Sequence, residues 1–190
     1  FYIYEIIMSR KALFLDRDGV ININYGYVHK VCDFEFLPGI FDLTRTAFQK
    51  DYIICVVTNQ AGIGRGLYSE TDFSALTDWM CDKFRKEGVI ISGVYYSPYH
   101  PIHGIGKYKR NHNSRKPNPG MLIKAISELN IDPDQSILIG DNLSDIQAAI
   151  AAGISERLLL AESKTDKDVD DTNFSKISSL KEAKTFLKDN

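Results

Sequence analysis

Asp16 and Asp18 stand two positions apart, directly after the apolar run of residues 11–15. Residues two apart in a strand project to the same side, so both carboxylates can face one ligand, while Arg17 should point to the opposite side. The pair also has an ordinary explanation, because buried strands commonly end in solvated turn residues. Alone, this D-x-D therefore leaves open whether the carboxylates form a strand end or a catalytic pair.

Three further apolar runs are each followed by polar side chains that could contact a phosphate. These are Thr58 and Asn59 after residues 52–57, Arg115 and Lys116 at the end of the long loop after residues 93–97, and Asp141 and Asn142 after residues 136–140. Each set alone is typical of a helix cap, a solvated loop or a turn. Together with the aspartate pair they supply every part that one reaction needs.

That reaction is phosphoryl transfer through an aspartyl phosphate. A carboxylate that attacks an anionic phosphate ester is repelled by it, so a divalent cation such as Mg²⁺, held by oxygen ligands, must bridge the two. Donors must hold the phosphate oxygens as charge develops, and a second carboxylic acid must protonate the leaving oxygen. Asp16, Asp18 and Asp141 can supply the carboxylates, and Lys116 the positive charge.

The elements that must position these residues follow from the alternation of β-branched apolar runs with helix-period segments. We expect strands at 11–15, 52–57, 93–97, 136–140 and 157–160, and helices near 39–50, 69–87, 120–130, 144–152 and 178–188. This order predicts an α/β fold, a three-layer Rossmann-like parallel sheet with helices on both faces. Ligands of such sheets bind beyond the carboxyl ends of the strands. The polar stretch from about 161 to 176 is expected to be a loose surface segment.

Four segments in this order, "FLDRDG", "VVTNQ", "RKPNPGM" and "IGDNLSD", resemble the motifs of haloacid-dehalogenase-like (HAD-like) phosphatases. With "GYV" and "YYSPYHP", the match narrows to the D-glycero-D-manno-heptose 1,7-bisphosphate 7-phosphatases and the related histidinol-phosphate phosphatases. The resemblance covers roughly residues 10 to 160 and implies a fold without a large cap domain. It implies a Mg²⁺-dependent hydrolase that removes the 7-phosphate of the heptose bisphosphate during surface-polysaccharide synthesis.

The same resemblance implies a role for each candidate residue. Asp16 would be the nucleophile and Asp18 the general acid/base, while Thr58 and Lys116 would stabilise the transferring phosphoryl group. Mg²⁺ would be held by Asp16, Asp141 and the backbone carbonyl of Asp18. The substrate contacts would be Asn59, Arg115, Lys116 and Asn142. The loop at residues 25–28 would help to shape the substrate pocket. Asn142 departs from the lysine that is common in the heptose branch, which weakens the assignment of the substrate and leaves the reaction class unchanged.

A second departure concerns the structural zinc that this family often holds in the loop before the R-K-P motif. The corresponding positions here are Ser97, Tyr99, His112 and Ser114. Because hydroxyl groups are poor zinc ligands beside thiolates and imidazoles, we predict that this zinc is absent. A rebuilt metal site that uses His100, His103 and His112 stays open, although three histidines in one loop are more often simply polar.

Composition limits the class of protein. The 190 residues include 23 Lys and Arg and 25 Asp and Glu, for a net charge of −2, so no basic field favours nucleic acid or an anionic membrane. Three widely spaced cysteines and the lack of a ~20-residue apolar run favour a cytoplasmic protein. We expect one HAD-like domain at 10–190 after an N-terminal extension at 1–9, acting as a monomer on a small phosphorylated metabolite.

Two rival functions remain open from the sequence. Histidinol phosphate, or another small phosphorylated metabolite, could be the substrate in place of the heptose bisphosphate. A HAD-fold binding protein without catalysis is the rival from another class, and the intact Asp16, Asp18, Lys116 and Asp141 argue against it. A nucleotide-binding dehydrogenase is excluded because no G-x-G-x-x-G follows the first strand.

Overall fold

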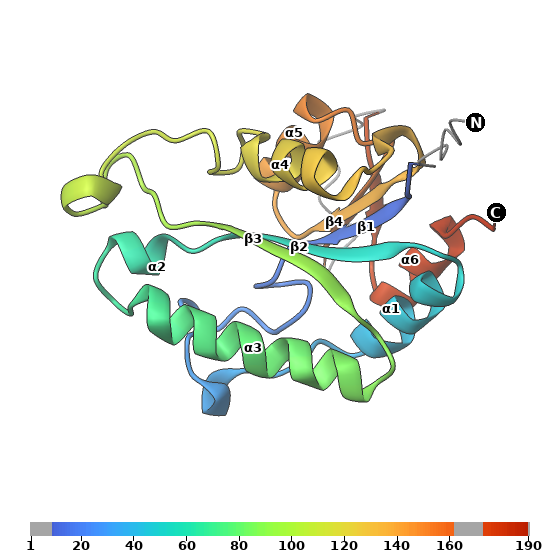
Figure 1. Cartoon of the computed structure of the whole chain (residues 1–190), viewed down its shortest axis with the longest axis horizontal. Coiled ribbons are helices and arrows are strands. Elements are labelled where there is room, and N and C mark those ends of the chain that lie inside the picture. The colour runs from blue at the N-terminus through green and yellow to red at the C-terminus, as the bar shows by residue number, and fades with distance from the viewer. Residues whose placement is uncertain (1–8, 162–172, 190) are drawn as a thin grey trace, which may run out of the picture.

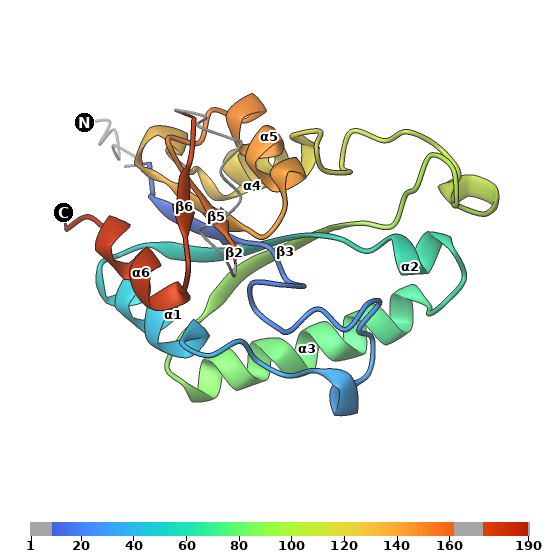
Figure 2. The same cartoon turned by 180° about the vertical axis from the view of Figure 1, so that it is seen from behind.

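The computed structural model describes residues 9–161 and 173–189, so residues 1–8 of the expected extension lie outside the described part of the chain. Within that part, the strands form one parallel sheet in the order β3-β2-β1-β4-β5-β6 (Figures 1 and 2). The strands are β1 (Ala12–Leu15), β2 (Ile53–Asn59), β3 (Ile91–Ser97), β4 (Ile137–Gly140), β5 (Glu156–Leu160) and β6 (Ser175–Ile177). The five expected strands are confirmed, with boundaries shifted by one or two residues.

Helices cover both faces of the sheet, as Figure 1 shows. One face carries α1 (Ile40–Gln49), α3 (Glu70–Lys86) and α6 (Leu180–Ala183), and the other carries α4 (Gly120–Leu129) and α5 (Leu143–Ala151). The alternation of β1 divides its side chains between two cores, with Leu13 and Leu15 on the α1/α3 side and Ala12 and Phe14 on the α4/α5 side. The predicted three-layer α/β fold is therefore confirmed.

The segment expected to be loose at 161–176 is partly ordered. Residues 162–172 lie outside the described residues, but β6 pairs in parallel with β5, so the prediction was wrong for its end. The strand has only three residues, and only Ile177 among them is fully buried, which leaves no periodic pattern to read. The helix expected at 178–188 is likewise reduced to the short α6 and a 3₁₀ turn at Lys184–Phe186.

Two irregular segments lie at the carboxyl ends of the strands. Residues 16–39 follow β1 and contain a 3₁₀ turn at Val31–Asp33, and residues 98–119 follow β3 and contain a 3₁₀ turn at Gly106–Tyr108. The short helix α2 (Ala61–Gly64), which the sequence did not predict, follows β2 at the same edge. Neither irregular segment folds as a separate cap domain. No helix of the described residues is long and apolar enough to cross a membrane.

Candidate active site

All eight residues singled out by the sequence lie around one pocket of about 360 Å³ at the carboxyl edge of the sheet. The eight are Asp16, Asp18, Thr58, Asn59, Arg115, Lys116, Asp141 and Asn142. Gly26 and Tyr27 of the loop at residues 25–28 also line it, together with Asn24. These residues come together because parallel neighbouring strands end at one edge of the sheet.

Asp16 and Asp141 come together because β1 and β4 are neighbours in the sheet. Leu15 lies opposite Ile139, and the Asp16 amide donates to the Ile139 carbonyl oxygen at 3.0 Å, which extends the pairing to the first residue beyond the strand. Asp141 follows the last residue of β4 directly. A Cβ atom on Gly19 would lie 2.0 Å from an Asp141 carboxylate oxygen, so the glycine lets the loop after β1 approach this carboxylate.

The structure adds Asp145, which sequence analysis did not include in the site. Oxygen atoms of Asp16, Asp141 and Asp145 lie within 4.8 Å of one another. Asp145 is the third residue of α5. Its Oδ2 accepts a hydrogen bond from the main-chain N–H of Asn142 at 3.0 Å, as part of a capping box. The spacing of four residues after Asp141, at the start of a helix, was the signal that could have identified it.

Lys116 is enclosed by this cluster and is 3% exposed. Its Nζ lies 3.0 Å from an Asp16 oxygen and 2.6 Å from an Asp145 oxygen, and it donates to the Val57 carbonyl at 2.8 Å. Asn59 fixes the lysine from its main chain: its amide oxygen accepts the Lys116 N–H at 3.0 Å, and its amide nitrogen donates to the Lys116 carbonyl at 3.1 Å. The two ends of the Asn59 amide are thus engaged within the protein.

The electrostatics of the cluster favour a bound cation. Burial raises the pKa of Asp16 to about 7, against the opposing effect of Lys116 and with help from Asp145 and Asp141. Burial and Asp145 raise the pKa of Asp141 to about 6. Burial lowers the pKa of Lys116, but attraction to Asp16 and Asp145 outweighs it, so the net shift is upward. One lysine cannot balance three carboxylates, and this oxygen-only donor set fits Mg²⁺.

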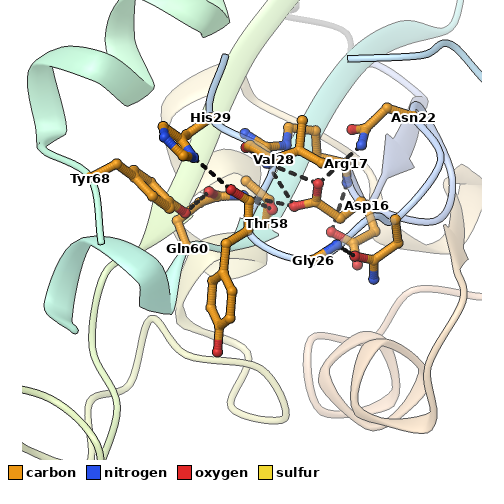
Figure 3. Close-up of polar contacts among 12 residues, drawn as sticks. Asp16, Arg17, Asn22, Gly26, Val28, His29, Thr58, Gln60 and Tyr68 are labelled. Carbon is orange, nitrogen blue, oxygen red and sulfur yellow. Dashed lines mark hydrogen bonds and ion pairs between the residues drawn. The ribbon is translucent and has the colours of Figure 1, made fainter. Parts of the chain in front are cut away.

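The prediction for Arg17 was wrong in part: its side chain is not among those that line the pocket, but it contacts Asp18 and so does not lie on the side opposite that carboxylate. Its Nη2 lies 2.8 Å from both carboxylate oxygens of Asp18 and donates to the Val28 carbonyl at 2.6 Å, in a side chain that is 2% exposed (Figure 3). The strand has already ended at this point: the Arg17 carbonyl accepts the amides of Ile21 and Asn22, at 2.8 and 3.1 Å. The turn replaces the period of two on which the expectation depended.

Asp18 is surrounded by hydrogen-bond donors from three directions. Besides Arg17, it accepts from the Asn22 amide at 3.1 Å and from the Gln60 amide at 3.0 Å. Gln60 also donates to the Thr58 hydroxyl oxygen at 2.9 Å, and both residues are 1% exposed. Gln60 belongs to the "VVTNQ" motif but was not predicted as a site residue, although its place directly after Thr58 and Asn59 was a usable signal.

Two further expected substrate contacts have partners within the protein. Arg115 is half-buried, donates to the Tyr99 carbonyl at 3.1 Å, and has a pKa lowered by burial. Asn142 is the N-cap of α5, and its side-chain oxygen accepts the Ser144 amide at 3.1 Å. Both side chains nevertheless line the pocket.

The four positions compared above with zinc ligands lie together. Ser114 Oγ donates to Ser97 Oγ at 3.0 Å and lies 2.7 Å from His112 Nδ1. The Tyr99 ring stacks on the His112 ring with centroids 4.0 Å apart. Of the other two loop histidines, His100 uses Nδ1 to accept the His103 amide at 2.9 Å. Hydrogen bonds and stacking therefore connect the end of β3 to the residue before Arg115.

Comparisons with known proteins agree with this geometry. A model of the family described as HAD-hydrolase-like matches residues 113–183. The chain is 53% identical over 155 residues to D-glycero-alpha-D-manno-heptose-1,7-bisphosphate 7-phosphatase of Burkholderia mallei, covering 82% of each protein. It is 44% identical over 182 residues to the enzyme of the same name from Campylobacter jejuni, covering 96% of this chain and 98% of that one.

A solved structure extends the likeness to the fold. The D,D-heptose 1,7-bisphosphate phosphatase from B. bronchiseptica, crystallised with magnesium and phosphate, superposes with a TM-score of 0.80 at 27% identity, covering 93% of this chain and 97% of that one. The shared fold, the identity over most of the chain and the clustered carboxylates lead to one conclusion. The chain belongs to the heptose-1,7-bisphosphate 7-phosphatase family of HAD-like hydrolases, which are phosphoric monoester hydrolases.

Proposed function

We propose that this protein is a Mg²⁺-dependent phosphatase that removes the 7-phosphate of D-glycero-D-manno-heptose 1,7-bisphosphate through a phosphorylated Asp16. The observation that carries the proposal is the position of Asp16, which lies at the pocket edge against Lys116 and beside Asp141 and Asp145. The names and identities of the relatives from Burkholderia mallei and Campylobacter jejuni support this substrate.

In the first half of the reaction, an Asp16 oxygen attacks phosphorus and the bond to the sugar oxygen breaks. Lys116 holds Asp16 in place, and Lys116 and the Thr58 hydroxyl are placed to stabilise the phosphoryl oxygens. Asp18 gives its proton to the leaving sugar oxygen. In the second half, Asp18 takes a proton from water, the water oxygen attacks phosphorus, and the bond to Asp16 breaks to release inorganic phosphate.

Asp16, Asp141 and the backbone carbonyl of Asp18, with Asp145 beside them, would hold Mg²⁺. When bound, the ion supplies positive charge that offsets the repulsion between the carboxylates and the phosphate. A positive charge at this place would reduce the repulsion among the three carboxylates, which have one lysine between them. The magnesium in the B. bronchiseptica structure supports this choice of metal.

The setting of the reaction is part of the same proposal. Three free cysteines, Cys32, Cys55 and Cys81, suit a reducing compartment, and we place the enzyme in the cytoplasm as a monomer. We further propose that the zinc common in the family is absent, since Ser97, Tyr99, His112 and Ser114 already bond with one another.

Initial rates of phosphate release with Mg²⁺ on both anomers of the heptose bisphosphate and on histidinol phosphate test the substrate. We expect a kcat/KM at least tenfold higher for one heptose anomer than for histidinol phosphate. Near-equal values would contradict the heptose assignment. An absence of turnover across a broad panel of phosphate esters would contradict the enzymatic function itself.

A further inference from the structure

Gln60 lies between two residues of the proposed chemistry and contacts both through one nitrogen. Its Nε2 donates to an Asp18 oxygen at 3.0 Å and to the Thr58 hydroxyl oxygen at 2.9 Å (Figure 3). The side chain is 1% exposed and follows β2 directly, so it has little freedom to move away. Gln60 also lines the pocket, and from this position it can fix the direction of the Asp18 carboxylate.

The orientation of the Gln60 amide is determined by its neighbours. The Asp18 oxygen that faces Gln60 already accepts a hydrogen bond from Arg17, so the amide nitrogen of Gln60 faces Asp18 and the amide oxygen faces the other way. There the Tyr68 hydroxyl donates to this oxygen at 2.5 Å, from a side chain that is 8% exposed. A flipped amide would set two acceptors against each other at Asp18, whereas the Tyr68 hydroxyl can either donate or accept.

The far side of Tyr68 contacts the loop that lines the pocket. The His29 ring stacks on the Tyr68 ring with centroids 4.9 Å apart and an interplanar angle of 5°, and His29 Nδ1 lies 2.8 Å from the Tyr27 carbonyl oxygen. Tyr27 lines the pocket. A continuous path of contacts therefore runs from the pocket loop through His29, Tyr68 and Gln60 to Asp18.

We propose that Gln60 and Tyr68 are positioning residues that hold the Asp18 carboxyl group at the leaving oxygen of the substrate. The inference rests on the proposed function, in which Asp18 protonates that oxygen. Thr58 Oγ accepts from Gln60, which leaves the hydroxyl proton of Thr58 free to donate to the phosphoryl group. Gln60 thus aligns the proton donor and one phosphoryl donor with each other.

The leaving group separates this role from general support of the fold. An alkyl phosphate such as a sugar phosphate needs a proton on the departing oxygen, and general acid catalysis contributes about 10²–10⁴-fold to such a step. The 4-nitrophenolate leaving group of 4-nitrophenyl phosphate departs without a proton. A misplaced Asp18 should therefore slow the alkyl ester selectively, whereas a damaged phosphoryl site slows both esters alike.

The test compares kcat/KM of wild type and Gln60→Met on the heptose bisphosphate and on 4-nitrophenyl phosphate, with saturating Mg²⁺. Methionine keeps the length of the side chain and removes the amide donor. We expect a loss of about 30-fold or more on the sugar phosphate and at least tenfold less loss on the aryl ester. Asp18→Asn should show the same selectivity in stronger form.

Tyr68→Phe provides a milder second variant if Gln60→Met does not fold, with a selective loss of about threefold expected for the sugar phosphate. Its matched control is Tyr52→Phe, which removes another buried hydroxyl. That hydroxyl accepts a hydrogen bond from the main-chain N–H of Lys188 at 3.2 Å, and its loss should change neither rate by more than about twofold. Equal losses on the two esters would overturn the positioning role. Wild type that fails to hydrolyse either ester would instead overturn the proposed function.

Discussion

Asp16 and Asp18 are separated by one residue, yet their surroundings are opposite in character. Asp16 lies among acids, because Asp141 and Asp145 are close by. Among the described residues, the positively charged side chain that contacts Asp16 is Lys116. Asp18 lies among donors, since Arg17, Asn22 and Gln60 all donate to its oxygens. One carboxylate is crowded by negative charge, and the other is held by hydrogen bonds.

This difference supports the two roles that we propose for one strand end. A carboxylate among acids has an unfavourable charge that a cation and an electrophilic phosphorus both relieve, which suits a nucleophile. A carboxylate that is held by several donors keeps a fixed direction, which suits proton transfer to one particular oxygen. The largest effects of substitution are expected on the acid-rich side, around Asp16.

The largest effect should come from Asp16→Asn. The substitution keeps the shape of the side chain and removes the attacking oxygen charge, so no phosphorylated residue can form. We expect phosphate release to fall by about 10⁴-fold or more, measured as initial rates with saturating Mg²⁺. Asp42→Asn, at a surface aspartate that pairs with Lys184, serves as the matched control and should retain wild-type rates. Residual activity within tenfold of wild type would contradict the assignment of the nucleophile.

Lys116→Met should give the second largest loss. It removes the positive charge that contacts Asp16 and Asp145, and the rate should fall by about 10²–10³-fold. Without divalent cations, the free energy of unfolding should also fall by about 3–5 kcal/mol, because buried carboxylates lose their partner. Urea unfolding measures this loss. Lys124→Met, at an exposed lysine of α4, should leave the rate and the free energy of unfolding nearly unchanged. A fully active Lys116→Met variant would remove the lysine from the mechanism.

The pH dependence of stability in metal-free protein should report the acid-rich surroundings of Asp16. The folded protein keeps a proton on Asp16 up to a pKa of about 7, whereas the unfolded chain releases it near 3.8. Across that interval the folded state binds more protons, so the free energy of unfolding should fall as pH rises from about 4 to about 7. The pKa of Asp141, raised from 3.8 to about 6, acts in the same direction.

Urea unfolding in EDTA at several pH values from 4 to 8 measures this slope. Asp16→Asn should flatten the slope and be more stable than wild type at pH 7, with little difference near pH 4. Saturating Mg²⁺ should restore wild-type stability at pH 7. Identical slopes for wild type and Asp16→Asn would show that the crowded carboxylates do not carry the unfavourable charge.

The smallest effect is expected from Ser114→Ala in the loop that carries Arg115 and Lys116. The variant loses the hydrogen bonds to Ser97 and His112, which should lower the free energy of unfolding by about 1 kcal/mol and activity by a few fold. Ser127→Ala on the exposed surface of α4 is the matched control. Elemental analysis of wild type should find no stoichiometric zinc, and one zinc per chain would contradict the hydrogen-bonded replacement.

The sequence was most informative where an element follows a regular period. Buried strands are recognisable as apolar runs, and a parallel sheet brings their carboxyl ends to one edge. The sequence therefore indicated that Asp16, Thr58 and Asp141 lie near one another, and all three line one pocket. It was least informative at short or edge elements. The strand β6 and the helix α2 have three and four residues, which is too few for a period to appear.

Within the site, the sequence alone determined the types of the reacting groups and the strand ends that carry them. The tertiary structure decided which groups touch. Arg17 turns back to Asp18 because the turn after β1 ends the alternation of side chains. Asp145 contacts Lys116, 29 positions away in the sequence, and Gln60 contacts Asp18, 42 positions away. Such contacts depend on the packing of strands and loops against one another, which no local pattern of residues encodes.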